Sequence, residues 1–276
     1  MPGRLISLEG GERSGKSTQL ALLSDHLRKR GMVFTVTREP GGTPFGERLR
    51  DVLLAPDLGA VSPLAEMVAF AASRAEVVAS VIRPALRRGE VVIADRFVDS
   101  SRAYQGYGLG VALADIDMVN GAATGHLVPD LTLLFDVDPA VAAVRAPERG
   151  HDRIEARGAD FHARVRFGYL ALAAAEPQRF TVLDAGLPVA EIATQVARAV
   201  ERCIAGEPSP NGPGNANPLE ETQGCAGFSR ASRLPGCAGF SRASRLPGCP
   251  GSWRASRAKR CTGSCRASWL QKGVAG

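Results

Sequence analysis

The first 204 residues of this chain contain a single cysteine, Cys203. One isolated cysteine argues against a catalytic thiol or a structural zinc site in this part of the chain. The chain also lacks any run of about 18 uncharged apolar residues, so we expect no membrane span. The N-terminus leads into a strand-like run and a glycine loop rather than a signal peptide, which predicts a cytoplasmic protein.

Acidic residues are scarce near the end of the chain. Residues 205–276 hold ten Lys and Arg against three Asp and Glu, a net charge of +7, whereas the preceding residues carry a net charge of −1. The overall charge of +6 therefore belongs to this tail. It does not predict nucleic-acid binding by residues 1–204.

The tail is built from a short repeat. The sequence Gly224–Pro235 recurs unchanged as 236–247, and degenerate copies follow. Gly, Ser, Pro and Arg dominate the repeat, so it has too little apolar surface to offset the entropy of ordering. We expect a folded domain over residues 1–204 and a disordered, low-complexity basic tail over 205–276 without a catalytic role. A metal-binding or nucleic-acid-binding tail is the alternative; salt-dependent nucleic-acid binding by residues 205–276 alone would support the latter.

Residues 1–204 alternate between short apolar runs and helical patterns. Five runs predict strands, at residues 4–9, 33–37, 91–94, 131–135 and 180–183. Near-continuous apolar runs are typical of a parallel sheet that is buried on both faces. Helical periodicity predicts helices over 17–30, 63–88, 160–175 and the stretch that follows Val189. The alternation predicts a three-layer α/β fold around a five-stranded parallel sheet.

A glycine loop follows the first predicted strand. It matches the phosphate-binding pattern Gly-x-x-x-x-Gly-Lys-Ser/Thr and precedes a predicted helix, which is the context that the motif requires. Its backbone amides would cradle phosphate oxygens, aided by the positive end of the helix. Lys16 would reach the β- and γ-phosphates, and the Ser17 hydroxyl would bind Mg²⁺. The predicted ATP-binding residues are Gly10, Gly11, Glu12, Arg13, Ser14, Gly15, Lys16, Ser17 and Thr18.

Asp95 and Arg96 follow the third predicted strand, and Arg38 and Glu39 follow the second. In an open parallel sheet, ligands bind beyond the carboxyl ends of the strands. At this edge Asp95 can complete the shell of Mg²⁺, and Arg96 can hold a phosphate as a fork. Ordinary surface ion pairs are the alternative for both dipeptides. Arg50 suits either a phosphate contact or a solvated helix face.

Two helical segments carry side chains that could contact a nucleobase or serve only the fold. Phe70 and Arg74 are four residues apart and share a helix face. They could sandwich and hydrogen-bond a base, although their spacing alone favours a core Phe beside an Arg that reaches water. The segment 100–106 offers Ser101, Tyr104 and Gln105. Without further evidence it is a polar helix start.

Three arginines, Arg145, Arg149 and Arg153, lie in a segment that Pro147 and Gly150 interrupt. Cations on a short lid would exclude water and stabilise charge on a moving phosphoryl group. A basic surface loop is the alternative. The short lid and the lack of an extra domain argue against a regulatory ATPase.

Taken in order, these segments resemble thymidylate kinase, over about residues 4–204. The resemblance rests on 8–19, 37–43, 70–74, 95–97, 100–106, 152–155 and 161–162. It implies phosphorylation of dTMP by ATP with Mg²⁺, and a homodimer. A kinase for another nucleoside monophosphate or a deoxynucleoside remains the alternative.

The resemblance also implies roles for single residues. Arg96 and Arg50 would hold the acceptor phosphate, Glu12 would lie near the sugar 3′-hydroxyl, and Tyr104 would pack beside the deoxyribose. Phe70 would stack on thymine, with Arg74, Gln105 and Ser101 at its polar edge. The predicted substrate residues are Glu12, Arg38, Glu39, Arg50, Phe70, Arg74, Arg96, Ser101, Tyr104 and Gln105.

The catalytic arginine has two possible sources. Bacterial relatives commonly have glycine where this loop has Arg13, and they supply the arginine from the lid; this chain has both. The predicted catalytic residues are Lys16, Arg13, Arg149, Arg153 and Asp95, with Ser17 and Asp95 as Mg²⁺ ligands.

Overall fold

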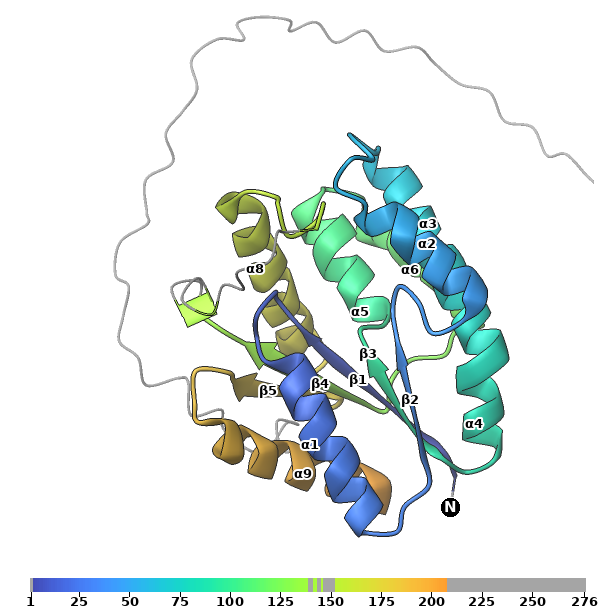
Figure 1. Ribbon diagram of the computed structural model, residues 1–276, viewed down its shortest axis with the longest axis vertical. Helices are drawn as coiled ribbons and strands as arrows, with labels where there is room; N and C mark the ends of the chain where they lie inside the picture. Colours follow the sequence, from blue (N-terminus) through green and yellow to red (C-terminus); the bar gives the residue numbers. More distant parts are fainter. Residues whose placement is uncertain (1, 139–140, 143–144, 146–151, 208–276) are drawn as a thin grey trace, which may run out of the picture. The chain divides into compact units, whose positions relative to one another are not determined.

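Five parallel strands form a single sheet in the order β2–β3–β1–β4–β5 (Figure 1). The computed structural model describes residues 2–138, 141–142, 145 and 152–207. The strands are β1 (Arg4–Gly10), β2 (Phe34–Arg38), β3 (Val91–Asp95), β4 (Leu131–Asp136) and β5 (Phe180–Asp184). Every strand end lies within one residue of its expected position, and the five-stranded parallel sheet is confirmed.

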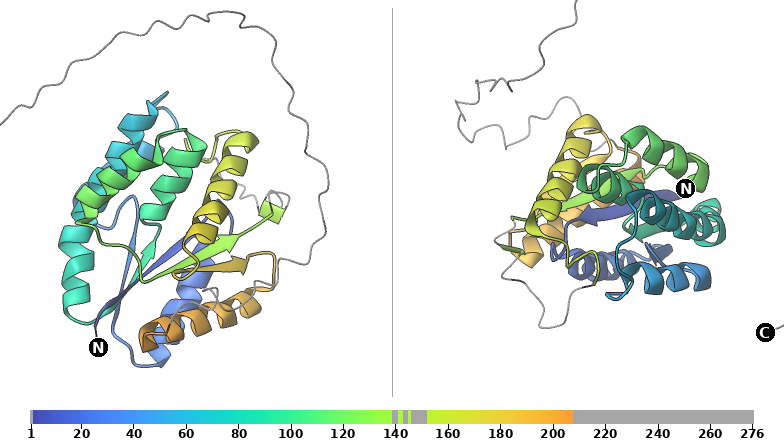
Figure 2. Two further views of the ribbon diagram at one scale, coloured as in Figure 1. Left: turned by 180° about the vertical axis from the view of Figure 1, so that it is seen from behind. Right: turned by 90° about the horizontal axis from the view of Figure 1, so that it is seen from above.

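Helices cover both faces of the sheet, as Figures 1 and 2 show. The α-helices are α1 (Lys16–Lys29), α2 (Pro44–Leu54), α3 (Pro63–Val77), α4 (Arg83–Arg87), α5 (Val98–Ser101), α6 (Leu113–Thr124), α8 (Ala159–Ala175) and α9 (Val189–Ala205). Two π-helical segments are η1 (Val78–Ile82) and η2 (Arg102–Gly108). The three-layer α/β architecture is therefore confirmed. Among the described residues, no helix is long and apolar enough to cross a bilayer.

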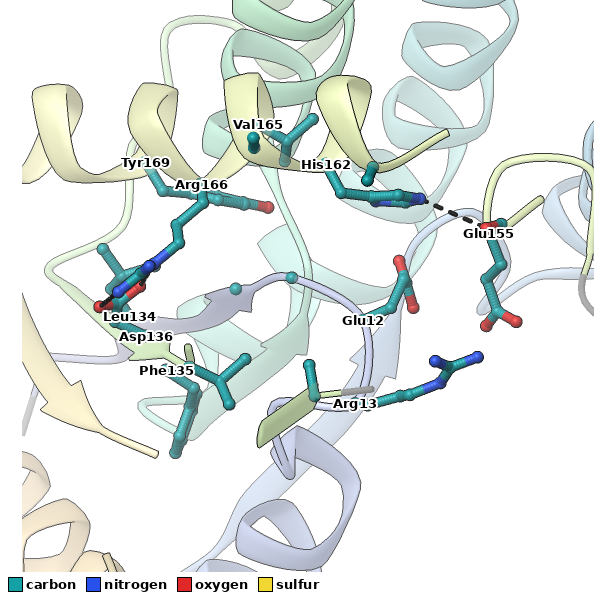
Figure 3. Close-up of a pocket in the computed structure, with 16 residues that line it drawn as sticks. Glu12, Arg13, Leu134, Phe135, Asp136, Glu155, His162, Val165, Arg166 and Tyr169 are labelled. Carbon is teal, nitrogen blue, oxygen red and sulfur yellow. Dashed lines mark hydrogen bonds and ion pairs between the residues drawn. The ribbon is translucent and has the colours of Figure 1, made fainter. Parts of the chain in front are cut away.

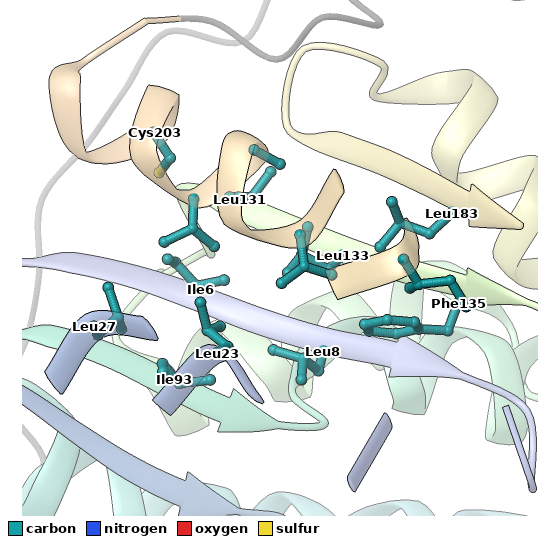
Figure 4. Close-up of a cluster of buried hydrophobic side chains, with 14 of the residues drawn as sticks. Ile6, Leu8, Leu23, Leu27, Ile93, Leu131, Leu133, Phe135, Leu183 and Cys203 are labelled. Atoms are coloured by element: carbon teal, nitrogen blue, oxygen red, sulfur yellow. The ribbon is translucent and has the colours of Figure 1, made fainter. Parts of the chain in front are cut away.

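Alternating side chains of β1 serve two different cores. Ile6 and Leu8 pack with Leu23 of α1 and Val196 of α9 (Figure 4). Leu5, which precedes Ile6 and points to the opposite face, packs instead with the cluster under η1 and α4. All of these side chains are buried, and each leucine-sized group contributes roughly 1.5–3 kcal/mol on burial. A strand that is apolar on both faces is thereby fixed between two helical layers.

The helical stretch expected over 63–88 is confirmed, and it consists of α3, η1 and α4 in direct succession. Pro84 lies in the first turn of α4 and has no amide hydrogen to donate to the preceding turn. A widened π turn before it accommodates the missing bond. The segment 100–106 is also helical, as expected, and most of it lies in the π-helical η2.

The last helix ends slightly later than the boundary expected at residue 204. Helix α9 runs to Ala205, and Gly206 closes it in the left-handed conformation with φ 81°. The Glu207 amide then donates to the Arg202 carbonyl oxygen. The expected disordered tail and its repeats, from residue 208 onward, lie outside the described residues.

The register of the sheet gathers the predicted site residues at one edge. In the backbone register, Asp95 at the end of β3 lies opposite Leu8 of β1 and Arg38 of β2. Gly10 at the end of β1 lies opposite Phe135 of β4. The chain moves from β1 to strands on one side and later returns to β4 on the other. The reversal opens a crevice beyond the carboxyl end of β1, where the glycine loop begins.

Candidate active site

The glycine loop turns directly from β1 into α1. Gly10 and Gly15 adopt φ values of 142° and 84°, which L side chains rarely reach. Gly15 caps α1 without a side-chain hydrogen bond, so the first amides of the helix have no capping acceptor. The Ser14 hydroxyl donates to the Gly11 carbonyl oxygen at 2.9 Å and tightens the turn. The local structure is an anion-binding loop.

Lys16 folds back into this loop. Its Nζ donates to the carbonyl oxygens of Gly10 at 3.1 Å and Gly11 at 2.8 Å, and only 8% of the residue is exposed. Burial and, next, the charge of Arg96 lower the pKa of Lys16 to about 8, although Glu12 and Asp95 act in the opposite direction. The negative charge of a bound polyphosphate would stabilise the protonated form of this buried amine.

Arg96 joins the glycine loop to the neighbouring cavity. It has a positive φ of 73°, and its guanidinium donates to Glu12 Oε1 at 2.8 Å and to the Gly10 carbonyl oxygen at 3.1 Å. The same carboxylate oxygen accepts a bond from the Tyr104 hydroxyl at 2.8 Å. Burial would raise the pKa of Glu12, but Arg96 and Lys16 outweigh it and bring the pKa to about 2. Glu12 is therefore an anion that holds Arg96 and Tyr104 in place.

The donor set beside the loop fits a small, hard cation. Asp95 Oδ1 is buried and has no hydrogen-bond partner among the described residues, and Ser17 is exposed at the start of α1. The described part of the chain contains no group of three or more His, Cys, Asp or Glu side chains that could form a full protein cage. Mg²⁺ suits such a site, because it keeps several waters and binds through few protein oxygens together with substrate phosphates.

A cavity of about 120 Å³ lies on the other side of Arg96. Eight of the ten predicted substrate residues line it, and they come from seven different elements or loops. These are Glu12, Glu39, Arg50, Phe70, Arg96, Ser101, Tyr104 and Gln105. The sequence prediction thus converges on one enclosed space, with an aromatic ring, a carboxamide and two guanidinium groups around it.

The remaining two predicted substrate residues do not line this cavity. Arg38 is 54% exposed in its side chain and pairs with Glu47 at 2.8 Å. Arg74 is only 1% exposed and donates four hydrogen bonds within the protein. The acceptors are Glu39 Oε2, the Ser101 hydroxyl, Asn120 Oδ1 and the Phe97 carbonyl oxygen, and Nη2 also lies 2.7 Å from Glu39 Oε2 in an ion pair. Arg74 therefore does not reach water, and all three of its guanidinium nitrogens are engaged within the protein in this structure.

A second cavity, of about 260 Å³, lies next to the glycine loop (Figure 3). The end of β4 and helix α8 form its other walls. Arg13, Glu12, Glu155 and His162 lie toward one end of it. Arg13 has a positive φ of 60°, so the loop presents its side chain from a backbone conformation that is uncommon outside glycine. One of the two predicted sources of the catalytic arginine, Arg13, therefore lies in the phosphate-binding loop and lines this cavity.

The lid arginines differ from the expectation. Arg149 lies outside the described residues. Arg153 is 10% exposed and donates to the Leu53 carbonyl oxygen at 2.9 Å and to Glu66 Oε2 at 2.7 Å. These bonds hold the guanidinium against α2 and α3, and its expected phosphate contact stays a prediction. Arg145, the third lid arginine, donates to the Ala185 carbonyl oxygen at 2.8 Å.

Sequence reasoning assigned no role to Glu9, which is fully buried on β1. Its carboxyl group accepts the Phe97 amide at 2.7 Å, the Ser100 hydroxyl at 2.6 Å and the Tyr169 hydroxyl at 2.9 Å. These bonds anchor the turn that follows Arg96. Burial, aided by Asp99, raises the pKa of Glu9 to about 7. A carboxylate within an otherwise apolar strand is the signal that could have identified it.

This pKa makes stability depend on pH. The folded state keeps the Glu9 proton up to about pH 7, whereas an ordinary Glu releases it near pH 4.5. The contribution of Glu9 to the free energy of unfolding is complete below about pH 4.5 and is lost as the pH rises through about 7. At about 1.4 kcal/mol per pKa unit the loss is on the order of 3 kcal/mol. We expect urea unfolding of Glu9→Gln between pH 5 and 8 to lack this decline. An unchanged pH slope relative to the exposed control Glu191→Gln would contradict the assignment.

Comparison with known proteins agrees with this geometry. The family model described as Thymidylate kinase matches residues 8–196. A thymidylate kinase from Deinococcus radiodurans is 51% identical over 199 residues, which cover 72% of this chain and 96% of that protein. One from Exiguobacterium is 50% identical over 186 residues, covering 67% of this chain and 88% of the relative. A crystal structure of thymidylate kinase from Ehrlichia chaffeensis superposes with a TM-score of 0.60 at 31% identity, over 73% of this chain and 99% of that one. The chain belongs to the thymidylate kinase family.

Proposed function

We propose that this chain transfers the γ-phosphoryl group of ATP to the 5′-phosphate of dTMP, in thymidine nucleotide biosynthesis. One observation carries the proposal: Arg96 contacts the phosphate-binding loop through Gly10 and Glu12, and it also lines the enclosed cavity. A donor nucleotide on the loop and an acceptor in the cavity would therefore meet at one guanidinium group. Membership of the thymidylate kinase family identifies the acceptor.

The loop amides and Lys16 would bind the triphosphate, and the residues of 10–18 would surround it. Mg²⁺, held by Ser17 and Asp95, would neutralise charge on the phosphate oxygens. The protein has little covalent chemistry to perform, because positioning and charge stabilisation dominate phosphoryl transfer. No general base is needed, since the acceptor oxygen is already anionic.

In the cavity, Arg96 and Arg50 would hold the acceptor phosphate. Arg50 is already positioned by its bond to the Pro40 carbonyl oxygen at 3.0 Å. Phe70 would stack on the thymine ring, and Gln105 and Ser101 would meet its polar edge. Tyr104, oriented by Glu12, would pack beside the deoxyribose.

Arg74 would act from behind this cavity, through Glu39 and Ser101, which line it. Glu39 lines the cavity, but its Oε2 accepts from Arg74 at 2.7–2.8 Å. Arg74 in turn donates to Ser101 at 3.0 Å. A base contact by Arg74 would require it to exchange one of these bonds. We assign the pair the task of fixing the cavity wall and Ser101.

For the transferred phosphoryl group, we propose that Arg13 supplies charge from the loop, together with Arg149 from the lid. The bonds of Arg153 to Leu53 and Glu66 favour an anchoring role for that residue.

A coupled ATP assay with dTMP, dCMP, UMP and thymidine tests the proposed function. The enzyme should turn over dTMP with the highest kcat/KM and should require added Mg²⁺. A higher kcat/KM with another acceptor would favour the alternative kinases. ATP hydrolysis that dTMP does not stimulate would favour a regulatory ATPase.

We further propose a homodimer that works in the cytoplasm. Support for the dimer comes from three helices that pack side by side, α2, α3 and α6. They carry apolar side chains that are between about two fifths and two thirds exposed, which is the usual character of an interface. These side chains are Phe45, Val52, Leu64, Val68, Leu113 and Met118.

Deleting residues 208–276 should leave dTMP kinase activity and the thermal midpoint nearly unchanged. This cut keeps the α9 cap at Gly206 and the Glu207 amide bond, which a cut after residue 204 would remove. The deleted segment contains five of the six cysteines. The truncated protein should therefore scatter less light than the full chain when both are stored without reductant. Loss of dTMP affinity, or unfolding, would show that the tail contributes to the kinase domain.

A further inference from the structure

Gln105 presents one end of its carboxamide to the protein and leaves the other end unbonded. The residue is 2% exposed, lies on η2 and lines the acceptor cavity. Its Nε2 donates to Glu66 Oε1 at 3.1 Å. Within the described part of the chain, its Oε1 makes no hydrogen bond. A carboxamide in this position can offer the cavity an acceptor.

The partner, Glu66, is an anion that is fully buried near the start of α3. Arg153 donates to its Oε2 at 2.7 Å, and Arg157 donates to both carboxylate oxygens at 2.6 and 3.2 Å. Burial alone would raise the pKa of Glu66, but the bonds from Arg157 and Arg153 outweigh it and lower the pKa. An ionised carboxylate has no proton to donate. It can face only the NH₂ end of Gln105.

We propose that Glu66 is a positioning residue that locks the carboxamide of Gln105 with its oxygen toward the substrate. This orientation selects a pyrimidine that carries an N–H at ring position 3, as thymine and uracil do. It rejects cytosine, whose N3 is itself an acceptor. The inference rests on the proposed function, because it concerns how that acceptor site chooses its base.

Binding of cytosine would be unfavourable in either orientation of the Gln105 carboxamide. Cytosine would bring its N3 lone pair against the Gln105 oxygen, and neither group could donate. To relieve this clash, Gln105 would have to turn over and point its oxygen at the Glu66 carboxylate. Two acceptors would then face each other in a buried site. A site built to hydrogen-bond its substrate discriminates strongly for this reason.

The variant Glu66→Gln tests this mechanism directly. The new side chain has nearly the same shape, but its carboxamide can accept from Arg153 and Arg157 while donating an N–H toward Gln105. Gln105 then turns over and offers its NH₂ group to the base. We expect the ratio of kcat/KM for dTMP to that for dCMP to fall on the order of tenfold or more. The ratio of dTMP to dUMP should stay constant, because both bases carry the N3 hydrogen.

The control is Glu201→Gln, which neutralises a half-exposed carboxylate paired with His26 on the distant face. It should leave both ratios unchanged. If dTMP and dCMP activities fall together in Glu66→Gln while the protein remains folded, Glu66 is merely structural and the proposal is wrong. If wild-type protein fails to phosphorylate dTMP at all, the proposed function fails instead.

A second variant covers the case in which Glu66→Gln does not fold. Gln105→Leu leaves the ionic cluster of Glu66, Arg153 and Arg157 intact and removes the carboxamide. Preference for dTMP over dCMP should collapse in this variant, with KM for dTMP raised more than KM for ATP. Preference that persists without the carboxamide would overturn the proposal, since Glu66 could then not act through Gln105.

Discussion

Lys16→Ala should abolish phosphoryl transfer while the protein stays folded. The amine already lies inside the phosphate-binding loop, where its bonds to Gly10 and Gly11 take the place of bonds to phosphate oxygens. A charge-assisted contact is worth roughly 1.5–3 kcal/mol, which corresponds to at least about tenfold in rate. The loss should exceed this minimum, because the charge on the transferred group grows in a site from which water is excluded.

Burial of this charge explains why stability should survive the substitution. The lowered pKa of Lys16 means that the fold disfavours its protonated form. Removing the amine therefore should not lower the thermal midpoint. The matched control is Lys29→Ala at the exposed end of the same helix, which should retain full activity. Turnover of Lys16→Ala above about a tenth of the wild-type rate would contradict the role, given the minimum energy of such a contact.

Those parts of the site that depend on local backbone geometry could be predicted from the sequence. The loop from Gly10 to Ser17 lies between a strand and a helix, and Asp95 ends a strand that pairs with the one before the loop. Strand identity follows from apolar runs, and parallel pairing then brings carboxyl ends to the same edge. No long-range information is needed for either step. The convergence of Arg50, Phe70 and Gln105 on one cavity was available only through the family resemblance.

Buried arginines could not be predicted in this way, because their partners are distant in the sequence. Arg153 bonds Leu53 and Glu66, which precede it by 100 and 87 residues. The four residues that accept hydrogen bonds from Arg74 likewise come from separate elements or loops. A basic residue in a loop segment suggests a solvated or catalytic group, and only the tertiary structure shows that its charge is neutralised inside the fold. The same limit applies to Glu66, whose burial a local pattern does not reveal.

Arg74→Ala should therefore act first on stability. Glu39 is 4% exposed, and its Oε1 is buried without a partner among the described residues, so Arg74 is its main source of compensation. Breaking a buried pair from one side typically costs about 3–5 kcal/mol, because the remaining charge stays in a low-dielectric site. Burial already raises the pKa of Glu39, with Arg74 acting against it. Without Arg74 the carboxyl group should take up a proton.

Protonation of Glu39 should make the stability loss in Arg74→Ala depend on pH. A carboxyl group whose folded pKa is raised stabilises the protein below its unfolded pKa and loses this contribution as the pH rises through the folded value. Urea unfolding should thus show Arg74→Ala to be destabilised less at pH 5 than at pH 8.

The double variant Glu39→Leu with Arg74→Leu removes both charges, and it should recover part of the lost stability, because apolar replacement of a buried pair is often tolerated. Arg74→Lys should not substitute, since an ammonium group has three donors where Arg74 makes four hydrogen bonds in a fixed planar geometry. Wild-type stability in Arg74→Ala, combined with weakened dTMP binding, would instead place this guanidinium on the base itself.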